Sequence, residues 1–150
     1  MKEKKNNMKK TFAIILGSLM VIFLYVIAGF PLIDQSFSGN WSFVLFLLPC
    51  LIFIALSIVL IVFTFKKKVE GKLKKFLLLA GISPLAMVVS VILHNLVFGL
   101  FIVFLGEDFW ERIGVGDEPF FFLLATVICP IAFLIGFLGS IILLIRIKKE

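Results

Sequence analysis

Four long stretches of this 150-residue chain contain no Asp, Glu, Lys or Arg. They cover residues 11–33, 42–65, 76–105 and 120–145. Because a helix rises about 1.5 Å per residue, about 20 apolar residues are enough to cross a hydrocarbon core of about 30 Å. The stretches are continuously apolar and lack the alternation of barrel strands. The sequence therefore predicts an all-α membrane protein, a four-transmembrane-helix bundle built from two helical hairpins.

The composition supports a bilayer rather than water as the solvent. Hydrophobic residues make up 62% of the chain, against about 45–50% in ordinary globular proteins. A chain this short has too little interior to remove so much apolar surface from water. The segments between the stretches are short and leave no room for a soluble catalytic domain. We therefore expect residues 1–150 to form a single integral membrane domain.

The basic residues predict the orientation of the helices. Fourteen of the fifteen Lys and Arg residues precede the first stretch, lie in the loop 66–75 or end the chain. The other two loops, 34–41 and 106–119, hold Arg112 and six carboxylates, a net charge of −5. The positive-inside rule then places both termini and the loop 66–75 in the cytoplasm of a multi-pass cell-membrane protein. Trp41 and Trp110 fall where an outer aromatic belt is expected.

The third stretch is longer than a single crossing needs. Within it, Gly81, Ser83 and Pro84 offer a second helix start, with Ser83 as N-cap and Pro84 at the first helical position. In that case the span covers residues 84–105, and residues 69–80 form a basic amphipathic segment on the inner leaflet. The sequence leaves both alternatives open, a span over 76–105 and one over 84–105.

Several polar or reactive side chains fall at similar depths in the predicted spans, about 12–17 Å from their outer ends. They are Tyr25, Cys50, His94 and Cys129, and Asn95 adjoins His94. Polar groups in hydrocarbon usually face the bundle interior or a wet cavity. This intramembrane polar layer is the candidate site, either for a small molecule, metal or proton, or simply for interhelical hydrogen bonds with the cysteines acting as small hydrophobes. The second interpretation is favoured.

Small residues recur at helical spacing along the fourth stretch and predict a packing face. Such a stripe lets two backbones approach closely. In the third stretch a mildly polar seam has the same spacing and is expected to face this stripe. The stripe is Ala125, Cys129, Ala132, Gly136 and Ser140, and the seam is Ser83, Met87, Ser90 and His94.

The loop 106–119 contains five carboxylates but lacks the spacing of a calcium-binding loop. We interpret it as a solvated acidic loop in which Asp117 and Glu118 favour the N-terminus of the fourth helix. No metal site is predicted, and no residue pattern identifies a cofactor. The two cysteines lie inside apolar runs and form no CxxC pair.

No residue pattern in the chain assigns a catalytic residue. One histidine is too few for bis-histidine haem or multi-histidine zinc, and the Glu-Glu and Gly-x-Ser-Gly signatures of intramembrane proteases are absent from the sequence. The leading hypothesis is a non-enzymatic accessory protein or self-associating bundle. The alternatives are a small oligomeric transporter or channel lined by His94 and Asn95, and a membrane-embedded enzyme or cofactor-binding protein.

The charge distribution also predicts partners. Lysines near an anionic leaflet contribute about 1 kcal/mol each, so we expect the cytoplasmic clusters to contact anionic lipid headgroups. The basic residues lack the aromatic interleaving and the folded reader module of a nucleic-acid-binding protein, and no nucleic-acid partner is expected. A second copy of the chain or another membrane protein is the expected protein partner.

Overall fold

The computed structural model describes residues 2–36 and 40–146, with the side chains of residues 6–27, 45 and 47–146. All regular structure in this part of the chain is helical. The elements are α1 (Lys2–Ser36), α2 (Asn40–Lys66), α3 (Gly71–Leu105), α4 (Phe109–Arg112), α5 (Pro119–Leu123), the π-helical turn η1 (Leu124–Ile128) and α6 (Cys129–Arg146).

Four apolar segments of this structure are long enough to cross a membrane, as the sequence predicted. Their bounds are Asn6–Ile27, Leu47–Lys66, Gly71–Leu105 and Pro119–Arg146. The helices α1 and α2 extend into the predicted loop 34–41, leaving residues 37–39 between them outside the described residues. The side chain of Trp41, predicted for the outer aromatic belt, also lies outside the described side chains.

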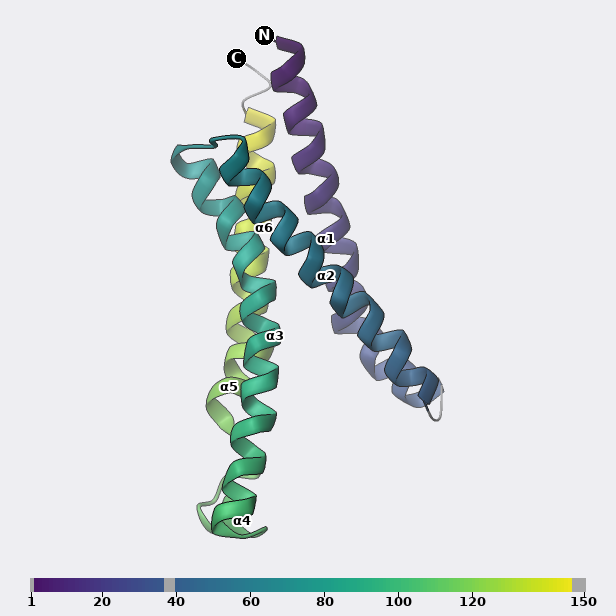
Figure 1. Cartoon of the computed structure of the whole chain (residues 1–150), viewed down its shortest axis with the longest axis vertical. Helices are drawn as coiled ribbons and strands as arrows, with labels where there is room; N and C mark the ends of the chain where they lie inside the picture. The colour runs from purple at the N-terminus through teal and green to yellow at the C-terminus, as the bar shows by residue number, and fades with distance from the viewer. Residues whose placement is uncertain (1, 37–39, 147–150) are drawn as a thin grey trace.

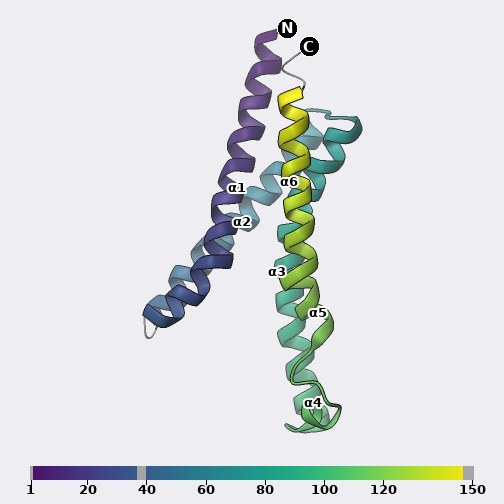
Figure 2. The same cartoon turned by 180° about the vertical axis from the view of Figure 1, so that it is seen from behind.

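The four long helices form two antiparallel pairs, α1 with α2 and α3 with α6 (Figure 1). The first residues of α1, the turn between α2 and α3, and the last residues of α6 lie together at one end, which we call the basic end. The short α4 lies at the opposite end of α3. Near the basic end the two pairs pack together, and farther along α1 and α2 turn away from α3 and α6, as both views show (Figures 1 and 2).

Among the described side chains, the hydrophobic core cluster lies in the half of the molecule nearest the basic end, which we call the inner half, the other being the outer half. The edge of this core farthest from the basic end is a cluster of three phenylalanines, one each from α1, α2 and α6. The ring of Phe133 lies 4.6 Å from that of Phe23 and 5.8 Å from that of Phe53, between centroids. The buried core consists of Phe12, Ile15, Leu16, Leu19, Phe23, Phe53, Leu60, Val69, Leu73, Leu77, Ala80, Phe133 and Leu144.

Glycines allow the closest helix contacts in this core. A Cβ placed on Gly136 of α6 would lie 2.5 Å from the backbone nitrogen of Ala80 and 2.9 Å from its Cα. A Cβ on Gly81 of α3 would lie 3.3 Å from the carbonyl oxygen of Ser57 in α2. Ala80 and Gly81 are adjacent, so α3 meets α6 on one side and α2 on another at the same level. Because it contacts both α6 and α2 at this level, α3 is the central helix of the inner half.

The helix α3 is continuous through Pro84, which resolves the two alternatives for its start in favour of one helix. Pro84 is fully buried, and the hydroxyl of Ser83 donates to the carbonyl of Leu79 at 2.6 Å. This bond goes to Leu79 rather than to Ala80, whose carbonyl loses the donor that Pro84 lacks. A proline inside a membrane helix is tolerated where neighbouring helices support the chain. Gly81 and Pro84 are therefore packing residues within one helix, and residues 71–80 are its first turns.

Candidate functional site

His94 lies between two carboxylates of the segment 106–118, which we call the outer loop because it lies at the end of the molecule opposite the basic end. Its Nδ1 is 3.3 Å from Oε2 of Glu118 and 3.2 Å from the carbonyl oxygen of the same residue. Its Nε2 is 3.4 Å from Oδ2 of Asp117. The side chains of His94 and Glu118 are 16% and 6% exposed, whereas that of Asp117 is 51% exposed. The imidazole is thus flanked on both ring nitrogens, by one buried and one exposed acid.

The position of His94 along α3 sets its depth. Lys75 is the last basic residue of the helix, and His94 lies eighteen residues beyond Phe76, a rise of about 27 Å. This is close to the thickness of a hydrocarbon core, about 30 Å. With Lys75 at one boundary of such a core, His94 lies near the opposite boundary. The last three turns of α3 extend beyond it to meet α4.

Glu118 holds the start of α5 as well as the histidine. It is the N-cap residue, and its carboxylate accepts hydrogen bonds from the backbone N–H groups of Phe120 and Phe121 at 2.8–3.2 Å. Pro119 follows at the first helical position, where its missing donor costs nothing. A carboxylate is favourable at a helix N-terminus because the free N–H groups carry partial positive charge. This part of the acidic-loop interpretation is confirmed for Glu118.

Aromatic rings cover the histidine and connect it to α4. His94 and Trp110 both stack on Phe98, with centroid distances of 6.5 Å and 5.8 Å. The indole N–H of Trp110 donates to the carbonyl of Phe98 at 3.4 Å, and Trp110 is 7% exposed. From α5, the ring of Phe122 lies 5.7 Å from His94. The loop therefore contacts the outer turns of α3 through aromatic stacking and through the two carboxylates.

Arg112 closes the outer end of α3. Its guanidinium donates to the carbonyl of Leu105 at 2.6 Å and lies 3.3 Å from Asp108. A cation is favourable at the C-terminal carbonyls of a helix. Gly106 follows with φ of 98°, a left-handed backbone conformation that suits glycine. Arg112, the lone basic residue of the outer loops, thus has a structural partner within the loop.

The structure distributes the predicted polar layer over both hairpins. Tyr25 donates to the carbonyl of Leu45 at 3.3 Å, a contact between α1 and α2, and Cys50 is half-buried on α2. Cys129 is buried at the start of α6, eleven residues after Glu118, or about 16 Å farther along the helix. His94 and Cys129 are therefore not brought to the same level.

Asn95 points away from the histidine cluster. It is exposed, and its amide nitrogen donates to the carbonyl of Val91 in its own helix at 2.8 Å. The hydrogen bonds of His94 instead lead to the outer loop. The two adjacent polar residues thus serve different faces of α3.

The predicted packing residues lie along the contact between α3 and α6. Gly136 faces Ala80, and a Cβ on the neighbouring Gly139 would collide with the ring of Phe76. Ala125 and Ser140 are buried, and Ala132 is half-buried. On α3, Ser83 and Ser90 of the predicted seam are also buried.

The cluster at His94 does not have the geometry of a metal centre. Its two carboxylates approach different ring nitrogens, so the three groups do not converge on a common point. Across the described residues, no group of three His, Cys, Asp or Glu side chains is arranged to hold a metal ion. No family model, curated protein or solved structure matches this chain.

Sequence reasoning identified His94 but did not pair it with Asp117 and Glu118. The local signal for Glu118 was readable, since an acid directly before a proline is typical of a helix start. The pairing joins residues 24 positions apart across the outer loop. It depends on how far the loop returns along α3, which no residue pattern states.

Proposed function

We propose that this chain is a non-enzymatic multi-pass membrane protein that works as a self-associated bundle, with both termini and the basic turn in the cytoplasm. The observation that carries this proposal is a face of α3 that α2 covers in the inner half and leaves uncovered farther out. We propose that a second copy of the chain packs on this uncovered face.

The uncovered face follows from helix geometry. Gly81 marks the side of α3 that contacts α2. Ile92 lies eleven residues later, and at about 100° per residue it falls within about 20° of the same side. Ile92 is nevertheless 60% exposed, because α2 turns away from α3 in the outer half (Figure 1). Asn95 continues this face by one turn and is also exposed.

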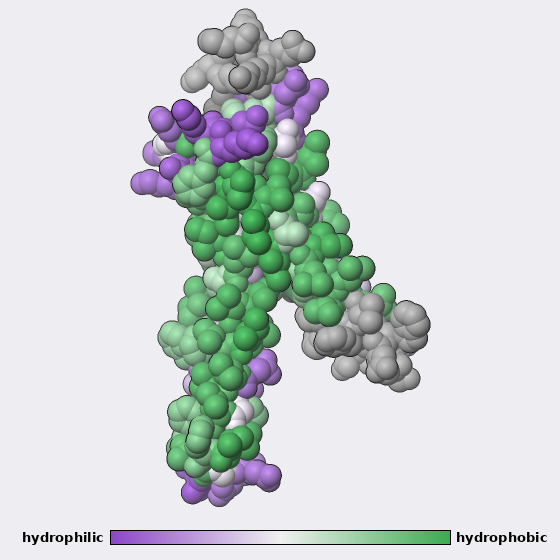
Figure 3. Space-filling model, in the orientation of Figure 1, coloured by the Kyte–Doolittle hydropathy of each residue, from purple (hydrophilic) through white to green (hydrophobic). Residues whose placement is uncertain are grey.

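The exposed area is large enough for a stable interface. The chain exposes 10159 Å², whereas the scaling for compact monomers of its mass gives about 7,700 Å². The difference, about 2,500 Å², is surface that lipid or a second copy covers, and it leaves room for the roughly 800 Å² per partner that a specific interface buries. Beyond the packed half, most of the visible surface of α3 and of the segments packed on it is apolar, with hydrophilic residues near the far end (Figure 3).

A twofold pair uses the same patch on both copies. The α3 helices of two copies then contact each other through Ile92, and the carboxamides of Asn95 exchange hydrogen bonds near the outer boundary. Such bonds between membrane helices contribute about 0.6 kcal/mol on average. The role of Asn95 in this arrangement is to fix the register of the pair rather than to provide most of its stability.

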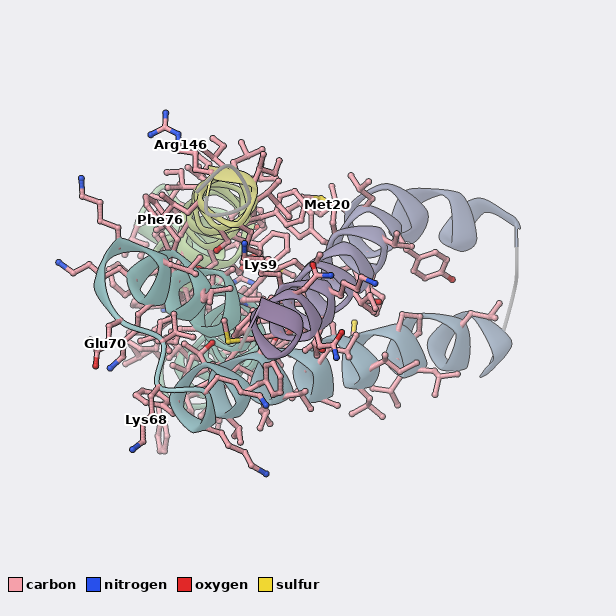
Figure 4. All side chains as sticks on the ribbon, turned by 90° about the horizontal axis from the view of Figure 1, so that it is seen from above. Lys9, Met20, Lys68, Glu70, Phe76 and Arg146 are labelled. Carbon is pink, nitrogen blue, oxygen red and sulfur yellow. The ribbon has the colours of Figure 1, made fainter. Side chains whose placement is uncertain are left out.

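The basic end supplies the lipid contacts of the proposed orientation. Lys68, in the turn between α2 and α3, and Arg146, at the end of α6, point outward at this end (Figure 4). Lys67 and Lys74 lie over the rings of Phe63 and Phe65, each 5.0 Å from the ring centroid. We propose that these side chains contact anionic headgroups of the inner leaflet.

Cysteine cross-linking in native membranes tests self-association. In a Cys50→Ser, Cys129→Ser background, Ile92→Cys is expected to form a disulfide-linked dimer on mild oxidation. The matched control is Val89→Cys, which lies at a similar depth with 53% exposure but is turned about 80° from Gly81. It is expected to remain monomeric. Equal cross-linking of the two variants, or none of either, would contradict the proposal.

The orientation has its own test. A membrane-impermeant thiol reagent applied from outside is expected to label a cysteine placed at Glu111 and to leave one at Lys68 unlabelled until the membrane is permeabilised. The reverse pattern would overturn the assignment of the basic end to the cytoplasm.

A second candidate function is favoured by the histidine cluster. A small oligomeric transporter or channel needs ionisable groups within or beside the span, and His94 with Asp117 and Glu118 supplies such groups near the outer boundary. Proton-coupled flux in reconstituted vesicles that is lost in His94→Gln, while cross-linking through Ile92→Cys persists, would support this function over a purely structural one.

A further inference from the structure

The hydrogen-bonding groups around His94 are all acceptors. Nδ1 faces the carbonyl and carboxylate oxygens of Glu118, and Nε2 faces a carboxylate oxygen of Asp117. A neutral imidazole has one N–H donor and one acceptor nitrogen, whereas an imidazolium has two donors. With both acids ionised, only the protonated ring can therefore satisfy both sides of this arrangement.

The surroundings of His94 make the loss of its second ring proton costly. The His94 side chain is 16% exposed and lies against the rings of Phe98 and Phe122. Water has limited access to replace a lost partner, and an unpaired group in such a site is costly. When the ring is neutral, one of its nitrogens presents a lone pair to a carboxylate oxygen, which is a repulsive contact.

The charged groups that face the ring are confined to the outer loop. Asp117 and Glu118 approach it directly, α5 contributes only aromatic rings, and Arg112 and Asp108 of the α4 region are engaged with each other and with the end of α3. No other charged side chain of the described residues contacts the imidazole. The charge balance of the cluster therefore depends on one proton on His94.

We propose that His94, Asp117 and Glu118 form a proton-binding site that fastens the outer loop to α3. The ligand is a single proton taken from the outer aqueous phase through the exposed carboxylate of Asp117. Its donor is a hydronium ion, whose O–H bond breaks and which leaves as water; the proton adds to the free imidazole nitrogen and gives an imidazolium that completes hydrogen bonds to both acids.

Proton occupancy then controls how tightly the loop is held. With the proton bound, both contacts hold the loop, and without it one of them is lost. Glu118 caps α5 and Trp110 stacks on the ring that contacts His94. Release of the proton therefore loosens the start of α5 and the aromatic contacts of α4 together.

Trp110 provides the optical test. The chain has two tryptophans, so Trp41→Phe leaves Trp110 as the sole emitter. In lipid nanodiscs, its emission is expected to move to longer wavelength as the pH rises from about 5 to about 8.5, because the indole becomes more exposed. His94→Gln in the same background is expected to abolish the change. A change of the same size in the His94→Gln protein, or none in the parent, would overturn the proposal.

Carboxylate variants supply the matched comparison. Asp117→Asn removes an exposed carboxylate that contacts His94 and is expected to weaken the pH response. Asp108→Asn removes an exposed carboxylate from the same loop that pairs with Arg112 instead, and is expected to preserve the response. Equal effects of the two substitutions would contradict a site centred on His94.

Nitrogen NMR reads the protonation directly and remains decisive if His94→Gln fails to fold. His94 is the single histidine of the chain, so ¹⁵N-histidine labelling of protein without a histidine tag reports on this ring alone. Both nitrogens are expected to be protonated at the acidic plateau of the Trp110 response and one at the alkaline plateau. A ring that keeps a single proton across the whole response would overturn the proposal.

Discussion

The inner and outer halves of this molecule are built from the same four helices but are held together by different interactions. In the inner half, buried phenylalanines and small residues join all four long helices into one core. In the outer half, α1 and α2 have turned away (Figure 1), and α3 is held to the loop and α5 by a histidine, two acids and stacked rings. Close packing of side chains stabilises the inner half, whereas a few polar and aromatic contacts hold the outer half together.

This difference has a physical basis in the membrane. Lipid tails are as apolar as leucine, so apolar contact alone gives membrane helices little reason to associate. Close backbone approach at Gly136 and Gly81 provides dispersion contacts that lipid cannot match. The outer half of α3 has no such close contact with α2, and the described polar contacts there are with the outer loop and α5. Mutations in the two halves should therefore differ in size and in kind.

The largest effect is expected from filling the closest helix contact. Gly136→Leu places side-chain atoms against the backbone of Ala80, which has no flexible end to move aside. Overpacking of this kind costs about 3 kcal/mol, and unfolding in mixed micelles should show the loss. The control is Gly99→Leu in the outer half, where a Cβ meets nothing within 4 Å. A similar loss in both variants would show that the crossing of α3 and α6 is not the stabilising contact.

A smaller loss is expected from opening a cavity at the boundary between the halves. Phe133→Ala removes the ring that contacts both Phe23 and Phe53. Because lipid also solvates apolar groups, we expect mainly the cavity contribution, on the order of 2 kcal/mol. The same micelle unfolding assay measures it. Phe104→Ala, which removes a ring that is 77% exposed in the outer half, should be nearly neutral, and a comparable loss there would erase the distinction between the halves.

The smallest of the three effects is expected from the outer contacts. Glu118→Ala removes the N-cap of α5 and one partner of His94, and loss of a helix cap typically costs about 1 kcal/mol. We expect local opening, seen as faster amide exchange at Phe120 and Phe121, with the inner core unchanged. Glu111→Ala, an exposed acid of the same loop, serves as the control. Faster exchange throughout the inner core would contradict a local role for Glu118.

The sequence was most informative where a single physical rule decides the outcome. The lengths of the uncharged stretches predicted four long apolar helices, and the structure has them. The small residues of the fourth stretch predicted a packing face, and one of them, Gly136, makes one of the closest helix contacts in the structure. Both features depend on local residue type and spacing, which a sequence states directly.

Other features depend on relations that a sequence does not state. The stretch 76–105 is ten residues longer than a typical crossing, and its excess proved to be the outer turns of α3 that meet α4 and the loop. Counting depth from Leu105 placed His94 among the cysteines, whereas the structure places it beside Glu118. Gly81 and Pro84 suggested a break in α3 because such residues usually end helices. Here Gly81 allows α2 to pack closely, and Pro84 is buried within a continuous helix.

The account depends most on the separation of the two hairpins in the outer half, and distances between spin labels test this directly. One pair of labels at Ile52 of α2 and Ile92 of α3 reports on the outer half, and a second pair at Val62 of α2 and Ile82 of α3 reports on the inner half. Labelled protein diluted with unlabelled protein in nanodiscs removes distances between copies. We expect a clearly longer distance for the outer pair than for the inner pair. Equal distances would show that the four helices stay parallel along their whole length and would contradict the account.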